Sequence, residues 1–192
     1  KKNDDFNLGE YQATDGTIMA GEWVGQSLTE GTMRMTDGAE YTGKFSPQGM
    51  FNHGSLLAVN GEHYVGSFKN NQYNGKGILS KLDGTTYVGS FSDGMFSGYG
   101  VLSESDQSVY SGQFLNGLPN GQGMQKDRSG VIYKGKWSEG YRNGMGILDF
   151  GDGTSYTGEF KNGLAHEGVY DWGDGVQTDS YQDENGNWLD RE

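Results

Sequence analysis

A short aromatic–glycine motif recurs along this chain at a fixed spacing. Five copies begin at intervals of 23 residues and share the pattern Tyr-x-Gly-x-Phe/Trp, starting at Tyr64, Tyr87, Tyr110, Tyr133 and Tyr156. Earlier copies begin at Tyr41 and, in drifted form, at Met19. A fixed period of 20 to 50 residues indicates stacked supersecondary units. We therefore expect the function to reside on a surface rather than in a single catalytic pocket.

Each repeat is predicted to form two antiparallel strands. In residues 64–86, Tyr64, Gly66 and Phe68 lie on one face and Val65 and Ser67 on the other, an alternation typical of a half-buried strand. A second strand is expected over residues 75–82. Asp83-Gly84 predicts a tight turn into the next repeat, and a longer loop (KNNQYN) is expected between the two strands of one repeat. Among the equivalent turns, only Asp106-Gln107 lacks the glycine.

The glycines inside the strands require a physical reason, because glycine normally weakens a strand. Neighbouring aromatic residues provide one: a position such as Gly89 lets the rings of Tyr64, Phe68 and the next repeat lie over bare backbone. A leucine column runs beside the aromatic residues, and Gln125 interrupts it. Such a repeat buries too little apolar surface to fold alone, so it must stack on its neighbours.

These residues resemble the MORN-repeat family, over about residues 9–178. The resemblance implies an all-β fold: an elongated, single-layer antiparallel sheet of consecutive β-hairpins, curled into an open trough. We expect three parts: a half repeat or cap at 1–18, an array of about seven repeats at 19–175, and a cap or tail at 176–192.

The composition excludes several classes of function. The chain has 192 residues, no cysteine and a net charge of −12. A disulfide framework and a thiolate metal site are therefore excluded. The acidity disfavours anionic membranes and nucleic acids. One stretch departs from it and is a candidate anion-binding cluster: Lys126, Arg128, Lys134, Lys136 and Arg142. A solvated charged face is the simpler interpretation of that stretch.

The main candidate site is the aromatic stripe with its neighbouring leucines. A single-layer sheet has no second layer to cover this stripe, so part of it is expected to line a groove for a partner. The alternative is that the stripe is simply the core. The predicted groove residues are Tyr64, Phe68, Tyr87, Phe91, Tyr110, Phe114, Tyr133, Trp137, Tyr156, Phe160, Leu79 and Leu102.

No catalytic constellation is apparent in the sequence. The turn aspartates are interpreted as turn formers. His53, His63 and His166 show no spacing suited to a metal or to acid–base chemistry, and no cofactor is predicted.

The prediction is a non-catalytic scaffold that binds a peptide or helix of a partner protein in its groove. The expected location is cytoplasmic, and the family resemblance implies cytoskeletal or membrane association. The absence of cysteine suits cytosol and periplasm alike, so the compartment and a processed leader stay open. A homodimer is left open, since an open sheet has two edges. The alternatives are a phosphoinositide-binding module and the repeat segment of a larger enzyme.

Overall fold

The structure is a computed structural model that describes residues 6–191. It divides into two compact units, Lys1–Met95 and Phe96–Glu192. Residues 6–191 contain β-strands and turns but no α-helix, so no helix there is long and apolar enough to cross a bilayer.

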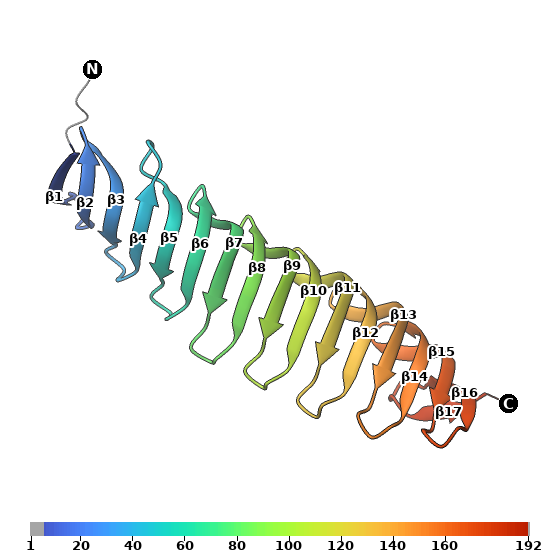
Figure 1. Cartoon of the computed structure of the whole chain (residues 1–192). Coiled ribbons are helices and arrows are strands. Elements are labelled where there is room, and N and C mark those ends of the chain that lie inside the picture. The colour runs from blue at the N-terminus through green and yellow to red at the C-terminus, as the bar shows by residue number, and fades with distance from the viewer. Residues whose placement is uncertain (1–5, 192) are drawn as a thin grey trace. The chain divides into compact units, whose positions relative to one another are not determined.

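In the N-terminal unit, each strand pairs antiparallel with the strand that follows it (Figure 1). The strands are β1 Phe6–Gln12, β2 Ile18–Val24, β3 Ser27–Arg34, β4 Glu40–Phe45, β5 Phe51–Leu57, β6 His63–Lys69, β7 Gln72–Ser80 and β8 Thr86–Ser92.

The C-terminal unit continues this pattern from β9 to β17. Its strands are β9 Met95–Ser103, β10 Val109–Leu115, β11 Leu118–Lys126, β12 Ile132–Ser138, β13 Tyr141–Asp149, β14 Ser155–Lys161, β15 Leu164–Asp171, β16 Gln177–Gln182 and β17 Trp188–Asp190. The all-β, open antiparallel sheet of consecutive hairpins is therefore confirmed.

The assignment of the two connections was wrong. The connection within a repeat is the tight one: Asn70-Asn71 and Asp93-Gly94 each have positive φ at both residues, as a two-residue type I′ turn requires. The Asp-Gly connection spans five residues, 81–85, and the Asp83 carboxylate accepts a hydrogen bond from the Thr85 amide at 2.8 Å. The second strand consequently begins at Gln72 rather than at residue 75.

A row of glycines crosses each unit at right angles to its strands. Register partners in the N-terminal unit are Gly9, Gly21, Gly31, Gly43, Gly54, Gly66, Gly77 and Gly89. The opening tyrosines lie in the adjacent row, where Tyr64 faces Leu79 and Leu56. Both rows belong to one face of the sheet, which we call the aromatic face.

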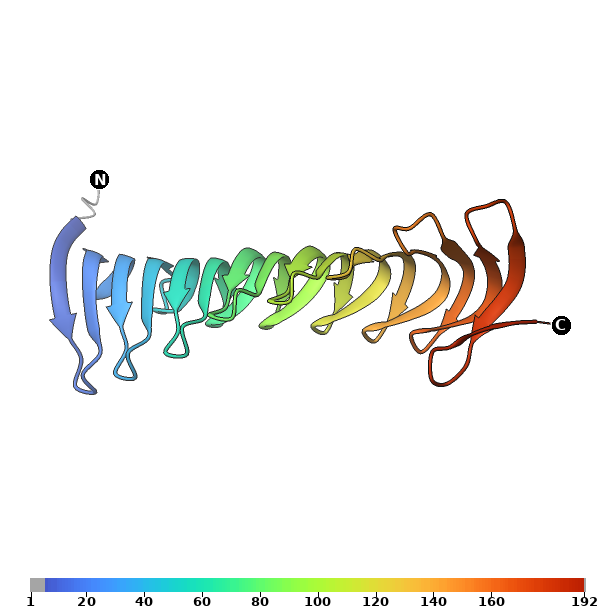
Figure 2. The same ribbon diagram turned by 90° about the horizontal axis from the view of Figure 1, so that it is seen from below.

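Each second strand is bent just after the hairpin turn. In β6 the register shifts between Gly66 and Phe68, and it shifts at the equivalent place in β10 and β12. Each shift marks a bulge in the partner strand, which is β7, β11 or β13. Gly75, in β7, has φ +78, a conformation that favours glycine. The later strands of the C-terminal unit, orange to red, are visibly curved in Figure 2.

Candidate protein-binding surfaces

Each opening tyrosine lies in a box of side chains on the aromatic face. The Tyr64 ring covers the backbone of Gly66 and Gly77, where any Cβ would collide with it. Phe68 and Phe91 form two walls, each at 5.0 Å between ring centroids and nearly perpendicular to the Tyr64 ring. Tyr73 stacks on the ring at 3.9 Å. The ring therefore lies over glycines of its own hairpin.

The tyrosine hydroxyl is also satisfied inside the box. The Tyr64 hydroxyl donates to the carbonyl of Ser67 at 2.9 Å, and the equivalent bond to the carbonyl three residues later is made by Tyr41, Tyr87, Tyr110, Tyr133 and Tyr156. Burial raises the pKa of Tyr64, Tyr110, Tyr133 and Tyr156 to about 12, because it disfavours the phenolate.

The structure places the predicted groove residues in the core of the sheet. All ten aromatic side chains of that set and Leu79 are buried, while Leu102 is partly buried. These rings cover one another, although the sheet has no second layer. Little of their surface is left for a partner.

The aromatic face is open at its N-terminal end. A pocket of about 830 Å³ lies over β1–β4. Its apolar lining includes Met19, Trp23, Leu28, Met33 and Phe45. Met19 occupies the position that tyrosine holds in the other repeats, since it pairs with Tyr11 and Met33 in the tyrosine row. Met19, Trp23 and Met33 are each partly exposed, whereas Tyr41 is fully buried.

A second apolar surface, which was not predicted, lies on the opposite face of the sheet. Val65, Ile78 and Val88 are successive register partners in the N-terminal unit, and all three are exposed. In the C-terminal unit, Met124 and Ile147 are exposed on either side of Lys134. The one-in-two spacing of these residues is visible in the sequence, where Val65 lies between Tyr64 and Gly66.

The five predicted anion-binding residues lie at three different places. Lys134 and Lys136 are exposed on the face opposite to the aromatic face, with Lys126 on the neighbouring strand. Arg128 is exposed in the turn after β11. Arg142 lies on the aromatic face, where its guanidinium is 5.1 Å from the centre of the Tyr133 ring.

Arg142 and Gln125 replace two apolar positions of the repeat and contact each other. The Arg142 guanidinium donates to the side-chain oxygen of Gln125 at 3.3 Å, which explains the interruption of the leucine column. Burial lowers the pKa of Arg142. The two departures from the repeat therefore compensate for one another.

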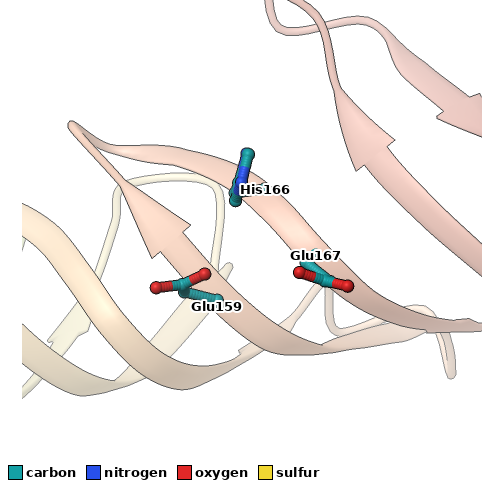
Figure 3. Close-up of side chains that lie close together, drawn as sticks. All are labelled: Glu159, His166 and Glu167. Atoms are coloured by element: carbon teal, nitrogen blue, oxygen red, sulfur yellow. The ribbon is translucent and has the colours of Figure 1, made fainter.

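Three possible metal ligands meet on β14 and β15 (Figure 3). Ligand atoms of Glu159, His166 and Glu167 lie within 4.8 Å of one another. The sequence spacing did not reveal them because they come from two strands, and the bulge beside Phe160 adds His166. Both carboxylates already pair with cations: Glu159 with Lys161 at 3.5 Å, and Glu167 with Arg191 at 3.3 Å. A divalent cation would have to compete with these ion pairs.

Fold and side-chain boxes together define a β-hairpin repeat protein whose core is made of rings stacked over glycine. A profile of the MORN repeat matches residues 64–86, 87–108, 110–131, 133–155 and 156–177, more than half of the chain. The chain therefore belongs to the MORN-repeat family.

Several solved structures resemble this fold. The G-box domain of the microcephaly protein CPAP aligns at a TM-score of 0.54 and 15% identity, covering 97% of this chain and 99% of that chain. The TCP10 domain of CPAP from Danio rerio aligns at 0.52 and 13%, covering 96% and 99%. The SAS-4 (dCPAP) TCP domain of Drosophila melanogaster, in complex with a proline-rich motif of Ana2, reaches 0.49 at 13% identity, covering 90% and 88%.

Identities this low establish a likeness of fold alone. The comparison with curated proteins gave no match.

Proposed function

We propose that this chain is a non-catalytic scaffold that binds a segment of a partner protein at the open part of its aromatic face. The observation that carries the proposal is the pocket over β1–β4. Its lining residues Met19 and Trp23 remain partly exposed, whereas the equivalent residues of the next repeats, such as Tyr41 and Phe45, are buried. An apolar concavity of this kind suits the side chains of a docked peptide or helix.

The buried aromatic residues of the repeats support this site indirectly. Phe45 lines the pocket and also forms a wall of the filled Tyr41 box. The ring centroids of Phe45 and Tyr41 are 5.1 Å apart. Rings fixed in this way give a binding surface that does not need to be ordered on association, which lowers the cost of binding.

Photo-cross-linking tests the proposal directly. Benzoylphenylalanine in place of Gln48, at the pocket, should cross-link one discrete partner in extract of the source organism. The same group in place of Thr42, on the opposite face of β4, should not. Trp23→Ala should abolish the Gln48 product. Equal labelling from both positions would contradict the proposal.

Binding to anionic lipid is the second candidate, favoured by exposed Lys126, Lys134 and Lys136 next to Met124 and Ile147. The net charge of −12 opposes it. Co-sedimentation with phosphoinositide vesicles at physiological salt distinguishes the two candidate functions. A scaffold that binds only a partner protein should remain in the supernatant, whereas a lipid-binding module should pellet with the vesicles.

A further inference from the structure

The pocket over β1–β4 has the walls of a tyrosine box but lacks the tyrosine. We infer that it receives an aromatic side chain of the partner, presented within a basic segment. This inference rests on the proposed scaffold function and specifies the chemistry of the segment that binds.

The neighbouring repeat shows what the box normally holds. The Tyr41 ring lies between Phe45 and Phe68, at 5.1 and 5.3 Å between ring centroids, and Phe51 stacks on it at 3.9 Å. The hydroxyl of Tyr41 reaches toward Gly43 and Gly54, where a Cβ would lie 2.8 Å from its oxygen.

The Met19 box has the same parts in the same register. Trp23 and Phe45 stand where Phe45 and Phe68 stand around Tyr41, and Leu28 takes the place of Phe51. All three line the pocket. The glycine pair Gly21 and Gly31 is kept, but the atoms closest to a Cβ built there are backbone atoms and not those of a ring. A ring from outside would therefore find walls already in place.

Recognition depends on the ring more than on a hydroxyl. In the Tyr41 box, the hydroxyl donates to the carbonyl of Lys44. The equivalent carbonyl in the Met19 box belongs to Glu22, and it already accepts a hydrogen bond from the Thr29 hydroxyl at 3.0 Å. Phenylalanine should therefore bind about as well as tyrosine.

The charge around the pocket specifies the residues that flank this ring. Glu10 is the one charged residue that lines the pocket, but its register neighbours Ala20 and Thr32 place its side chain toward the opposite face, so the attraction comes from the acidity of this unit as a whole. Residues 6–51 contain six carboxylates and two cations, and one of those cations, Arg34, is already paired with Glu40 at 2.7 Å. A segment with lysine or arginine beside its aromatic residue complements the net negative charge of residues 6–51.

Two probes test the inference on the full chain: the peptide Lys-Lys-Phe-Lys-Lys and its leucine counterpart Lys-Lys-Leu-Lys-Lys. The readout is the ¹³C-methyl NMR signals of Met19 and Met33. The phenylalanine peptide should give saturable shifts of both signals, with an affinity at least fivefold tighter than that of the leucine peptide. A Glu-Glu-Phe-Glu-Glu peptide should bind at least tenfold more weakly than the lysine version at low salt.

Met19→Phe is the decisive variant because it fills the box from within. It should raise the melting temperature and abolish the shift of Met33 on addition of the phenylalanine peptide. Met145→Phe, an exposed methionine in the C-terminal unit, is the matched control and should leave binding unchanged.

The outcomes separate the two proposals. Equal binding of the leucine and phenylalanine peptides would overturn the aromatic specificity while leaving a scaffold pocket. Shifts that persist in Met19→Phe would overturn the box as the binding site. If the peptide binds as expected but Gln48 cross-links no partner, the scaffold proposal fails and the ring receptor stands.

Discussion

The tyrosine ring and the glycine beneath it are a single structural device. At Gly77, the three atoms nearest to a Cβ all belong to the Tyr64 ring, and the φ of Gly77 lies outside the positive range. This glycine is therefore required by the ring and not by the backbone conformation. Glycine normally weakens a strand, but here the lack of a side chain lets the aromatic ring pack on the backbone. The burial of that ring outweighs the cost of the glycine.

A double-mutant cycle measures this coupling. Gly77→Ala should destabilise the protein by about 2 kcal/mol, because the added methyl group forces the Tyr64 ring out of its box. In a Tyr64→Ala background, the same change should cost less than about 0.5 kcal/mol. Urea unfolding followed by fluorescence measures each step, and additive effects would show that the ring is not the obstacle.

The buried tyrosines should make the fold sensitive to alkali. The pKa is about 12 for Tyr64, Tyr110, Tyr133 and Tyr156, above the usual value of 10. The folded protein therefore holds these phenolic protons more tightly than the unfolded chain does. Stability is then unaffected below pH 10 and falls between pH 10 and 12. Denaturant midpoints across this range, with phenolate absorbance at 295 nm, test this. Full tyrosine ionisation near pH 10 in a folded protein would contradict it.

At the scale of the hairpin, residues at positive φ decide which connection is tight. Asn116-Gly117 and Asn162-Gly163 form the two-residue turns, and asparagine and glycine adopt the left-handed region at low cost. Gln107 is a departure: it has φ +75 at the place where Gly84 and Gly130 stand in other repeats.

Replacing Gln107 with glycine should therefore stabilise the protein. A non-glycine residue in this region costs about 1–2 kcal/mol, and the greater freedom of glycine in the unfolded chain recovers part of that. We expect a net gain of about 0.5–1 kcal/mol for Gln107→Gly, measured as a higher urea midpoint with an unchanged slope. Gln122→Gly, in a strand and without positive φ, is the control and should destabilise.

The sequence predicted the hairpin repeat because its period and alternation are properties of single residues along the chain. It failed on the two connections, because Asp83-Gly84 and Asn70-Asn71 are both turn signals and only φ at each residue tells them apart. The groove was predicted over residues 64–160 because the sequence does not show which rings cover one another. In the structure, for example, Tyr73 stacks on Tyr64 and covers it. Met19 was recognised as a drifted copy, but the pocket that follows from it requires the register of three neighbouring strands.

At the scale of the whole molecule, tyrosine boxes within each unit take one wall from the repeat that follows. Tyr64 uses Phe91 in this way, and Tyr133 uses Phe160 at 4.8 Å between ring centroids. Tyr156 takes its second wall from Trp188 in β17, at 4.9 Å between ring centroids, and Trp188 lies beyond the residues that the repeat profile matches. Trp188 also packs on Tyr170 at 5.0 Å. Trp188 thus completes the box of Tyr156.

Trp188→Ala should therefore loosen the last hairpins and leave the others intact. Contacts in a repeat protein are made between neighbours, so the loss of one wall destabilises locally, here by about 1–3 kcal/mol for a large, partly exposed ring. Hydrogen exchange should speed up in β14–β17 and stay unchanged in β2–β8. Trp172→Ala is the matched control, because Trp172 touches Tyr170 at 4.5 Å but forms no wall of the Tyr156 box, and it should have a smaller effect. Uniform acceleration along the chain would instead show that the repeats unfold as one cooperative unit, and the role assigned to Trp188 as a local wall would then be lost.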